Sequence, residues 1–577
     1  MIKSKLKIPN HLNNYIVDQN YSRYTAIDHA CWRFIMKLST DFFSKHAHSS
    51  YLSGLDATGI SREHIPKISN INSKLNNINW NAVPVRGFLP PTIFMQFQAH
   101  SILPIASDMR TVSHLTYTPA PDIVHEAAGH SPIIADEEYS KYLSNYGRAA
   151  SKAIYSRFDH EIYMAIRNLS DIKENPSTHL DDIIKAEDEL KNKINAMPFI
   201  SEAAYLARLN WWTVEYGLVG DIKNPKIFGA GLLSSVGESY NAIFGNVKKL
   251  PLSLDCIEYS YDITEQQPQL FVAQDFNHLN QVLDEFIKGM AFYNGGISSM
   301  QKAINSESIS TFKLDSGIEI SGIPTEIIGE GKEEFFRFSG PVQICYKGKE
   351  LEGHSGDYHN QGFSSPLCSN QIIDKISSTS EEEWVDIQFD SGIKLNGRLN
   401  SKLFNKNILL IASFSDCTIS KNDQILFEPS WGIFDLACGT SVVSVYGGPS
   451  DIQSYLKFMD VELPNLEQPV YNYPDCKTDS LEYLYKEIKS MRDQKNIDRD
   501  KILDISSQIK STYPTEWLLR YEIMELISDF NINISDLYDQ MKADILRISN
   551  EDIDLQQSIQ RAIQIIESSI SDKNSRI

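Results

Sequence analysis

The sequence predicts a multidomain chain in which a mainly α-helical part is followed by a β-rich part and then by a second helical part. Its length of 577 residues is too great for a single hydrophobic core. Before about residue 305, long stretches carry few helix breakers, whereas 310–455 alternates short Val-, Ile-, Phe- and Tyr-rich runs with Gly, Ser, Asn and Asp. The helical period then returns near the C-terminus. We therefore place the domains at residues 1–305, 306–460 and 461–577.

The first domain is expected to be largely helical. Residues 28–38 have the pattern of an amphipathic helix start, and 134–169 and 199–218 are long helical candidates. Between these two candidates, residues 170–198 are rich in Asp, Glu and Lys. A charged run of this kind is typical of a solvated face, so 170–198 is predicted to be a helical insertion on the surface.

The β-rich domain contains a weak internal repeat. Segments 315–322 and 390–397 both begin with Asp-Ser-Gly-Ile and end in Gly, which is the pattern of a turn that leads into a strand. Two related β units and chance similarity in Gly-rich β sequence are both open at this point.

The C-terminal domain is expected to pack onto the rest of the protein. Pro514 lies where the first turn of a helix is predicted. Leu555, Ile559, Ala562 and Ile566 form an apolar stripe at helical spacing. The stripe spans too few heptads for a coiled coil, so packing against the body of the protein is the preferred interpretation.

Charge and composition argue against several classes of function. A net charge of −21 at pH 7 disfavours binding to nucleic acid or to an anionic membrane. No apolar run reaches the length of about 18 residues that a membrane span needs, and the basic N-terminus lacks the apolar core of a signal peptide. The seven cysteines are scattered and odd in number, which suits a reducing compartment. We expect a cytoplasmic protein with small-molecule partners, and the oligomeric state is left open.

Two histidines, His125 and His130, lie five residues apart, and Glu126 follows the first. A zinc-protease helix places its two histidines four residues apart, so that both face one metal ion. Five residues apart on an ideal α-helix, two side chains diverge by about 140°. Both can face one ion only if the helix ends or bends between them, and Gly129 and Pro132 are residue types that end helices.

A metal held by two neutral imidazoles and one carboxylate keeps positions open for other ligands, as in non-haem Fe(II) enzymes that use O₂. The carboxylate must come from elsewhere in the chain, because Glu126 points about 100° away from His125 on a helix. Glu215 is the candidate, since it lies among two tryptophans, a valine, a tyrosine and a leucine, where an unpaired charge would be costly. The alternative is that Glu215 faces solvent from an otherwise buried helix.

The stretch from Tyr117 to Pro132 resembles the signature of the pterin-dependent aromatic amino acid hydroxylases. It matches Tyr-Thr-Pro-x-Pro-Asp-x-x-His-Glu-x-x-Gly-His-x-Pro at every fixed position. The resemblance extends over about residues 20–300 and implies a mainly α-helical catalytic domain of the aromatic amino acid hydroxylase type. Four further segments resemble family segments in the correct order, namely 85–94 (the pterin-side loop), 211–217 (the third iron ligand), 229–235 (the glycine-rich substrate wall) and 264–268.

The resemblance implies a role for each matching residue. Iron would be bound by His125, His130 and Glu215. The substrate would be bound by Arg110, Tyr117, Thr118, Pro121, Trp211, Tyr216, Gly231 and Ser234, with the Arg110 guanidinium on its carboxylate, where a planar fork is suited to bidentate contact. The pterin would lie among Phe88, Leu89 and Phe94, with Glu126 at its reactive edge as the catalytic carboxylate. The alternatives are a surface position for Arg110 and plain core packing for the three apolar pterin residues.

The implied activity is that of a mononuclear Fe(II) monooxygenase that uses O₂ and tetrahydrobiopterin or a related tetrahydropterin. Phenylalanine is the expected substrate, as in bacterial phenylalanine 4-hydroxylases. Tryptophan and tyrosine stay as alternatives, because the residues expected around the substrate ring (the slot residues) do not distinguish the three amino acids. A zinc metallohydrolase that uses His125, His130 and Glu126 is a further alternative, and the five-residue spacing argues against it. The separation of His130 from Glu215 is longer than the family pattern, and 170–198 accounts for the excess. Residues 306–577 resemble no family of defined function, and a binding or scaffolding module is the alternative to a catalytic role there.

Overall fold

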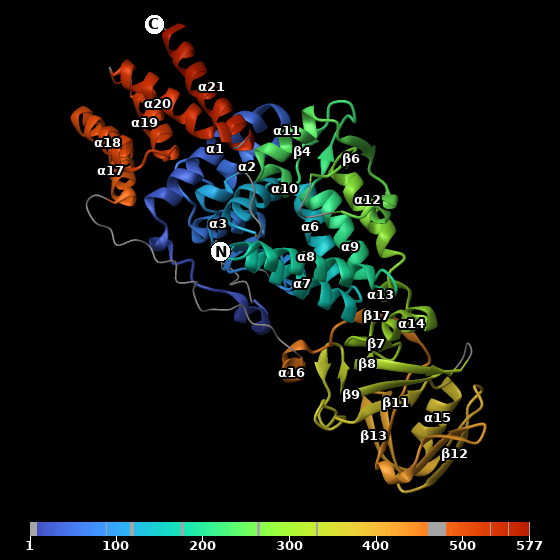
Figure 1. Ribbon diagram of the computed structural model, residues 1–577. Coiled ribbons are helices and arrows are strands. Elements are labelled where there is room, and N and C mark those ends of the chain that lie inside the picture. Colours follow the sequence, from blue (N-terminus) through green and yellow to red (C-terminus); the bar gives the residue numbers. More distant parts are fainter. Residues whose placement is uncertain are drawn as a thin grey trace. The chain divides into compact units, whose positions relative to one another are not determined.

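The computed structural model describes residues 8–87, 89–115, 121–174, 178–261, 266–329, 333–459, 480–530, 532, 534–551 and 553–575 (Figure 1). The chain divides into two compact units, and each combines three stretches of sequence. The first, here called the helical unit, combines 15–145, 208–280 and 463–577. The second, the β-rich unit, combines 1–14, 146–207 and 281–462. The three domains expected along the chain stay a prediction.

The helical unit is built mainly from α-helices. Those in its first stretch are α1 (Ala26–His46), α2 (Ser50–Thr58), α3 (Ile68–Leu75), α4 (Pro91–Ala99), α5 (Ser131–Ile134) and α6 (Glu137–Ala150). Those in its second stretch are α10 (Ala230–Leu233), α11 (Val236–Phe244) and α12 (Phe276–Ile287). Those in its third stretch are α17 (Leu481–Gln494), α18 (Arg499–Thr512), α19 (Leu518–Asp529), α20 (Ser535–Ile548) and α21 (Ile553–Ser575). Helices α6 and α12 continue past the limits of the unit.

Two small sheets complete the helical unit. Strands β1 (Asn81–Val85) and β2 (Ile102–Ala106) pair in parallel, and β2 is buried along its whole length. The second sheet has the order β4 (Lys226–Ile227), β3 (Leu218–Val219), β6 (Gln269–Ala273) and β5 (Lys248–Pro251). Single turns of 3₁₀-helix lie at η2 (Tyr21–Arg23), η3 (Asn76–Ile78), η4 (Val112–His114) and η7 (Leu254–Glu258).

Helix α1 begins with a reciprocal cap and carries a broad buried face. The Thr25 hydroxyl accepts a hydrogen bond from the Asp28 N–H, and the Asp28 carboxylate accepts one from the Thr25 N–H. These bonds satisfy backbone donors that the first turn of a helix leaves open. All residues from 29 to 36 are buried, so the helix expected at 28–38 forms, but it is buried on all sides there and is not amphipathic.

The C-terminal helices pack against α1. The Phe34 ring makes edge contacts with Trp517 and Tyr521, at centroid distances of 5.0 and 4.9 Å. In the apolar stripe of α21, Ile559, Ala562 and Ile566 are buried, and Leu555 is half-buried. Helix α21 contacts α1, so the expectation that this stripe packs onto the body is confirmed. Residue Pro514 lies in the turn before α19, not inside a helix, so the predicted helix begins a few residues later than expected.

A buried ion network joins α1 to these helices. The Arg33 guanidinium donates to both carboxylate oxygens of Glu522 at 2.6–3.2 Å, and both side chains are almost fully buried. Lys37 pairs with Glu525 at 3.0 Å, and Arg492 pairs with the same glutamate at 3.0 Å. Buried charges of this kind are tolerated only when they are paired, so each residue here depends on its neighbours.

In the β-rich unit, the charged stretch 170–198 falls mostly in two helices. These are α7 (Arg157–Glu174) and α8 (Leu180–Asn195), which contact each other. Of the residues of α8, Ala186 is buried and the others are exposed or half-buried. The helical, solvent-exposed character expected of this stretch is therefore found, and its role as an insertion stays a prediction. The remaining helices of the unit are α9 (Glu202–Asn210), α13 (Ala291–Asn294), α14 (Gly296–Ser306), α15 (Asn370–Ser378) and α16 (Ile452–Tyr455), with 3₁₀ turns η1 (Asn10–Tyr15), η8 (Pro429–Trp431) and η9 (Leu456–Phe458).

Two antiparallel sheets form the rest of the β-rich unit. One contains β7 (Ser310–Leu314), β8 (Ile318–Ile328), β9 (Phe335–Tyr346), β10 (Lys349–Glu350), β11 (Gly362–Pro366) and β17 (Val442–Gly447). The other contains β12 (Trp384–Gln388), β13 (Ile393–Asn405), β14 (Ile408–Lys421), β15 (Gln424–Phe427) and β16 (Phe434–Ala437). The described residues of the unit form two apolar cores: one includes Phe312 and Ile320 of the first sheet together with Ile411 of the second, and the other includes Leu395 and Phe414 of the second sheet together with Phe335 of the first.

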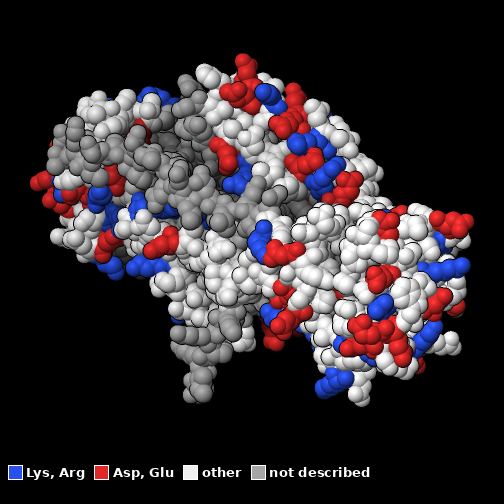
Figure 2. All heavy atoms as spheres, turned by 90° about the horizontal axis from the view of Figure 1, so that it is seen from below, with Lys and Arg blue, Asp and Glu red and all other residues white. Residues whose placement is uncertain are grey.

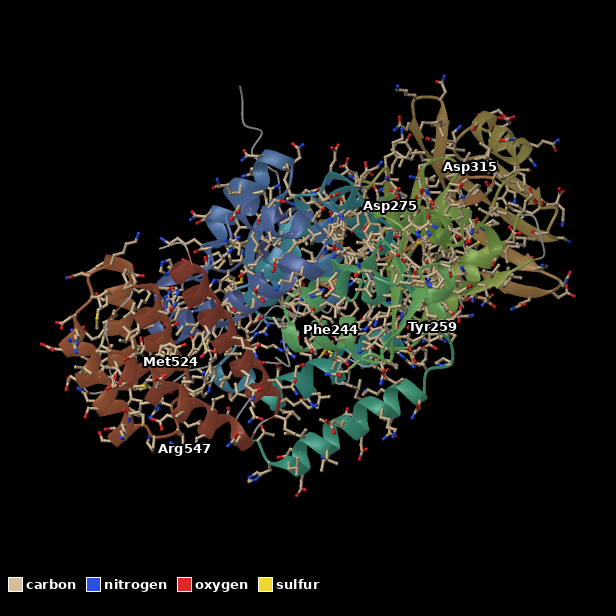
Figure 3. The ribbon with its side chains drawn as sticks, turned by 90° about the horizontal axis from the view of Figure 1, so that it is seen from above. Phe244, Tyr259, Asp275, Asp315, Met524 and Arg547 are labelled. Carbon is tan, nitrogen blue, oxygen red and sulfur yellow. The ribbon has the colours of Figure 1, made fainter. Side chains whose placement is uncertain are left out.

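The two sheets share one topology. In each, a short strand turns into a long one (β7 to β8, β12 to β13), a second long strand pairs with it (β9, β14), and a later strand returns to that second long strand (β11, β16). The long hairpins both break register at the glycine that ends the repeat, Gly322 in one and Gly397 in the other. Asp315, at the first repeat's turn (Figure 3), accepts a 2.8 Å hydrogen bond from the Thr440 N–H. This shared pattern favours two related β units over chance similarity.

The surface carries both signs of charge. On the face in Figure 2, acidic and basic side chains are interspersed over the described residues. None of the described helices combines the length and the hydrophobicity that crossing a bilayer requires.

Candidate active site

His125 and His130 lie on a π-helix, η5 (Val124–His130), which continues directly into α5. The hydrogen bonds of a π-helix run between residues five apart, so side chains at this spacing come onto the same face. The expectation that the helix ends between the two histidines at Gly129 and Pro132 is therefore wrong. The helix is widened instead of broken, and this widening aligns a pair that an α-helix would separate.

Gly129 allows a close helix contact beside this pair. A Cβ atom at Gly129 would lie 2.7 Å from the carbonyl oxygen of Ala230 in α10. Any larger residue would push α10 away from η5. The glycine that was expected to end the helix thus serves to bring the glycine-rich segment 229–235 against it.

Glu215 ends a second π-helix, η6 (Trp211–Glu215), in which the Tyr216 N–H donates to the Trp211 carbonyl at 2.8 Å. The Glu215 side chain is 16% exposed, so the alternative in which it faces solvent does not hold. Helix α10 contacts both π-helices, and the Gly231 N–H hydrogen-bonds to the Glu215 carboxylate. The two widened helices and α10 together position the three predicted ligands.

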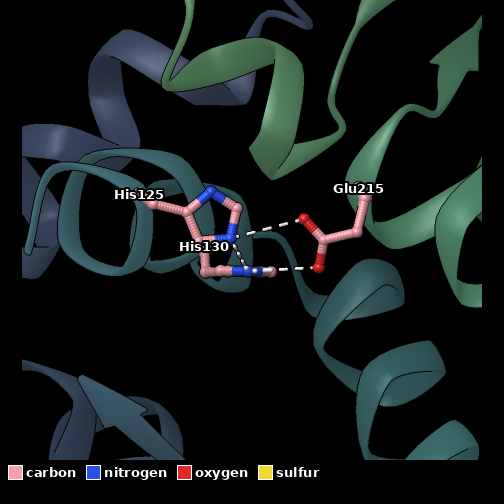
Figure 4. Close-up of side chains that lie close together, drawn as sticks. All are labelled: His125, His130 and Glu215. Carbon is pink, nitrogen blue, oxygen red and sulfur yellow. Dashed lines mark hydrogen bonds and ion pairs between the residues drawn. The ribbon is translucent and has the colours of Figure 1, made fainter. Parts of the chain in front are cut away.

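The ligand atoms of His125, His130 and Glu215 converge (Figure 4). The two Nε2 atoms are 3.2 Å apart, and the Glu215 oxygens lie 3.4 Å from Nε2 of His125 and 3.5 Å from Nε2 of His130. With metal–nitrogen bonds of about 2.0–2.1 Å, a nitrogen separation of this size corresponds to an angle of roughly 100° at a shared ion. The geometry therefore fits one metal ion held by two imidazoles and a carboxylate, with further positions open.

Burial sets the charge of these groups. Burial lowers the pKa of His125 to about 4 and holds the pKa of His130 well below its usual range, with the neighbouring imidazole adding to the effect at His130. Burial also raises the pKa of Glu215 to about 7, against the opposing hydrogen bonds from Asn210 and the Gly231 backbone. Neutral imidazoles are the form that binds metals. A bound cation would offset the cost of an ionised carboxylate here.

Arg110 is buried beside this cluster, so the surface alternative for it does not hold. Its Nε and one terminal nitrogen donate to the two oxygens of Asp122 at 2.7 and 2.8 Å, and its other terminal nitrogen reaches the Ser234 carbonyl at 3.4 Å. Asp122 also accepts from the backbone N–H of His125 at 3.0 Å. The same carboxylate thus fixes the arginine and caps the helix that carries His125.

Ser234 connects the glycine-rich segment to His125. Its hydroxyl lies 3.1 Å from Nδ1 of His125 and donates to the Gly231 carbonyl at 3.1 Å. A partner at Nδ1 fixes the orientation of an imidazole and leaves Nε2 to face the ion. Ser234 was predicted at the substrate carboxylate, and its position adds a contact with His125.

Aromatic rings form one side of the site. Trp211 stacks on Tyr216 at 4.6 Å and on Tyr261 at 4.4 Å. A Cβ atom at Gly231 would lie 3.1 Å from the Tyr216 ring, so a glycine is needed to keep this wall in place. The predicted slot residues Trp211, Tyr216 and Gly231 are therefore brought together, and Pro121 lies next to Asp122 at half exposure.

Sequence reasoning missed two residues of this site. Asp122 had a usable signal, because it stands three residues before His125 within the quoted motif, where a carboxylate can cap a helix start. Tyr261 had none, since its ring reaches Trp211 from a loop after η7.

The residues predicted for the pterin are only partly described. The Glu126 carboxyl is buried, lies 3.9 Å from Nε2 of His130, and has its pKa raised well above the usual value by burial and by the Glu215 and Asp122 charges. Leu89 is buried and Phe94 is half-buried on α4. Phe88, Tyr117, Thr118 and residues 264 and 265 of the segment 264–268 lie outside the described residues.

Two imidazoles and one carboxylate around an open position define the class of mononuclear non-haem metal sites. The family model of the biopterin-dependent aromatic amino acid hydroxylases matches residues 5–160 and 200–295, so this part of the chain is similar to that family. The unmatched interval between the two segments contains most of α7 and all of α8.

Named relatives agree with the family match. The phenylalanine-4-hydroxylase of Caulobacter vibrioides is 26% identical over 272 residues, which cover 47% of this chain and 75% of that protein. The phenylalanine-4-hydroxylase of Pseudomonas aeruginosa is 26% identical over 275 residues, covering 47% of this chain and 88% of that protein. The crystal structure of Chromobacterium violaceum phenylalanine hydroxylase with bound iron(III) and 7,8-dihydrobiopterin aligns over 49% of this chain and 92% of that chain, with 23% identity and a TM-score of 0.37.

Proposed function

We propose that the chain is a phenylalanine 4-monooxygenase, which converts L-phenylalanine to L-tyrosine with O₂ and tetrahydrobiopterin at a mononuclear Fe(II) centre. The convergence of His125, His130 and Glu215 within a matched hydroxylase segment is the observation that carries the proposal. The named relatives in bacteria support phenylalanine as the substrate. The family match also argues against the zinc metallohydrolase alternative, which would use Glu126 in place of Glu215.

His125, His130 and Glu215 would hold the iron, and three protein ligands leave further positions on such an ion for other groups. Iron and pterin, when bound, supply the activation of dioxygen, while the protein positions the reacting groups and excludes water. Ser234 orients His125 through Nδ1, and Asp122 fixes the start of its helix. Both contacts stabilise the ligand geometry without occupying an open position on the metal.

The other predicted site residues are assigned to the substrate and to the pterin. The aromatic wall of Trp211, Tyr216 and Gly231 is suited to the flat face of a substrate ring. We assign Pro121, Tyr117 and Thr118 of the matched segment to the same substrate on the resemblance alone. We assign the pterin to Phe88, Leu89 and Phe94. Glu126, buried 3.9 Å from Nε2 of His130, would hold a proton or a water molecule near the bound pterin.

The partners of this enzyme are small molecules, and we propose a cytoplasmic location. The described cysteines are all buried and carry no disulfide, which suits a reducing compartment. The negative net charge disfavours nucleic acid as a partner.

Product analysis of the full chain tests the proposed function. With Fe(II), O₂ and tetrahydrobiopterin, the protein is expected to form tyrosine from phenylalanine, with about one pterin oxidised per product, and to act more slowly on tryptophan and tyrosine. Chromatography of products from each amino acid gives the measurement. A faster reaction with tryptophan or tyrosine would replace phenylalanine as the substrate, and no pterin oxidation with any of the three would contradict the assignment altogether.

Arg110→Ala is expected to raise the KM for the amino acid about ten- to a hundredfold, with a smaller effect on kcat. A hydrogen bond to a charged group is worth about 1.5–3 kcal/mol, which corresponds to this range. Asp122 takes the Nε edge of Arg110 and the Ser234 carbonyl lies 3.4 Å from its other terminal nitrogen, so the N–H groups of the two terminal nitrogens that these contacts do not use would bind the substrate carboxylate. Steady-state kinetics provide the test. The comparison variant Arg110→Lys keeps the positive charge but lacks the planar guanidinium group that can donate two parallel hydrogen bonds. An unchanged KM in Arg110→Ala would restrict the arginine to a structural pairing with Asp122.

A further inference from the structure

A second group of metal-binding side chains lies in the β-rich unit. His354 and His359 lie on the loop between β10 and β11, and Asp435 lies on β16. One ligand-type atom from each residue lies within 4.8 Å of the other two. His359 is 7% exposed and Asp435 is 5% exposed. The hydroxylase family match ends before this region, so the proposed iron site gives no reason for the cluster.

The loop that carries the two histidines is fixed to β9 by its backbone. The Ile344 N–H donates to the His354 carbonyl at 3.0 Å, and the Val342 N–H donates to the His359 carbonyl at 3.1 Å. The His359 N–H in turn donates to the Ser355 carbonyl at 3.0 Å. The backbone of each histidine is therefore attached to β9 at one point, which gives the loop the rigid support that a binding site requires.

The geometry of the histidine pair fits a shared ion. Nδ1 of His354 lies 3.2 Å from Nε2 of His359, and the rings are nearly parallel at an interplanar angle of 17°. With metal–nitrogen bonds of about 2.0–2.1 Å, two nitrogens at this distance can bind one ion at an angle of roughly 100°. The alternative is a direct hydrogen bond between the two imidazoles, and a metal-binding measurement separates the two.

Asp435 is held in place to complete the set. The Ser413 hydroxyl on β14 donates to one carboxylate oxygen at 2.5 Å, and the Tyr358 side chain also hydrogen-bonds to the carboxylate. Groups that hydrogen-bond to a ligating carboxylate orient it toward the ion.

We propose that His354, His359 and Asp435 form a second metal site, which binds a divalent transition ion of the Zn²⁺ type. Two imidazole nitrogens and a single carboxylate suit Zn²⁺ better than Ca²⁺ or Mg²⁺, which prefer sets of oxygen ligands. The three side chains leave a fourth position on a tetrahedral ion for water or for a small ligand. The bound ion joins the β10–β11 loop to β16. The loop belongs to the first sheet and β16 to the second, so the ion links the two β units.

The test uses the full chain with the first site removed by His125→Ala and His130→Ala. Zn²⁺ titration by calorimetry, with metal content measured by mass spectrometry after gel filtration, is expected to give one equivalent bound. Adding His359→Ala is expected to weaken this binding by more than about a hundredfold, because loss of even an outer-shell group costs about 10- to 100-fold. Asp357→Asn is the matched control, since this carboxylate lies on the same loop, is 65% exposed and pairs with Lys457. It is expected to keep the full equivalent.

A second variant guards against loss of fold. His354→Gln retains a side chain of similar length and hydrogen-bonding capacity, and it is also expected to lose Zn²⁺ binding while keeping the circular dichroism spectrum of its parent. Absence of Zn²⁺ binding in the parent chain, or full binding in both His354→Gln and His359→Ala, would overturn the proposal. The result is independent of hydroxylase activity, because the parent chain lacks the ligands of the proposed iron centre.

Discussion

His130→Ala is expected to remove bound iron and to lower kcat/KM for the amino acid substrate by more than about a hundredfold. The imidazole is 1% exposed, and its Nε2 faces both His125 and Glu215. Substitution of a group that merely supports a metal ligand costs about 10- to 100-fold in affinity or activity, and loss of a ligand exceeds that. Iron content by mass spectrometry and tyrosine formation are measured on the same preparation.

His160→Ala provides the control for this experiment. His160 is an exposed histidine on α7, outside the predicted ligand set, so its replacement is expected to leave iron content and activity unchanged. An iron content in His130→Ala equal to that of the parent would remove His130 from the metal centre. Loss of activity with retained iron would point to damage elsewhere in the site.

Arg33→Ala is expected to destabilise the protein by about 3–5 kcal/mol, the usual effect of breaking a buried ion pair. The substitution leaves Glu522, whose side chain is 1% exposed, without its two-point partner. Arg492 lies 3.6 Å from the same carboxylate and compensates in part, which places the expected value toward the lower end. The measurement is the shift of the thermal unfolding transition followed by tryptophan fluorescence.

Arg62→Ala is the matched control for charge removal. Arg62 is 46% exposed and its partner Asp56 is 75% exposed, at a separation of 3.9 Å. Removal of an exposed pair of this kind changes stability by less than about 1 kcal/mol. Equal transition temperatures in Arg33→Ala and the parent would show that α1 does not depend on the C-terminal helices for its stability.

The ligand identities could be predicted from the sequence, but the backbone that presents them could not. The five-residue spacing of His125 and His130 excluded an α-helical protease site, and the resemblance supplied Glu215 as the third member. A π-helix of one or two turns leaves no recognisable hydrophobic pattern in the sequence. A helix break was therefore the explanation that the sequence offered for two histidines five residues apart facing one ion. Asp122 was within the quoted motif, and its contact with Arg110 became visible only when the two side chains were placed in space.

Long-range packing was beyond sequence reasoning for a different reason. The β-strand pattern of 310–455 and the stripe on α21 follow from local periodicity, and both were found in the structure. The pairing of Arg33 with Glu522 joins residues that no local pattern relates. The pair His354 and His359 repeats the five-residue spacing of the first pair, yet without a nearby acid or a family resemblance the spacing alone did not single it out.

The capping of α1 has a consequence for biosynthesis. Glu482 of α17 accepts a 2.8 Å hydrogen bond from the Ala26 N–H, across a sequence separation of 456 residues. Domains generally fold in order as they leave the ribosome. Here an N-terminal helix must wait for a partner made near the end of translation, while the intervening β-rich unit can complete its own sheets. The surface of α1 that packs against α17, α19 and α21 therefore stays uncovered for most of the chain's synthesis, which is the interval in which chaperones would be needed, although α2 and α11 can contact the helix earlier.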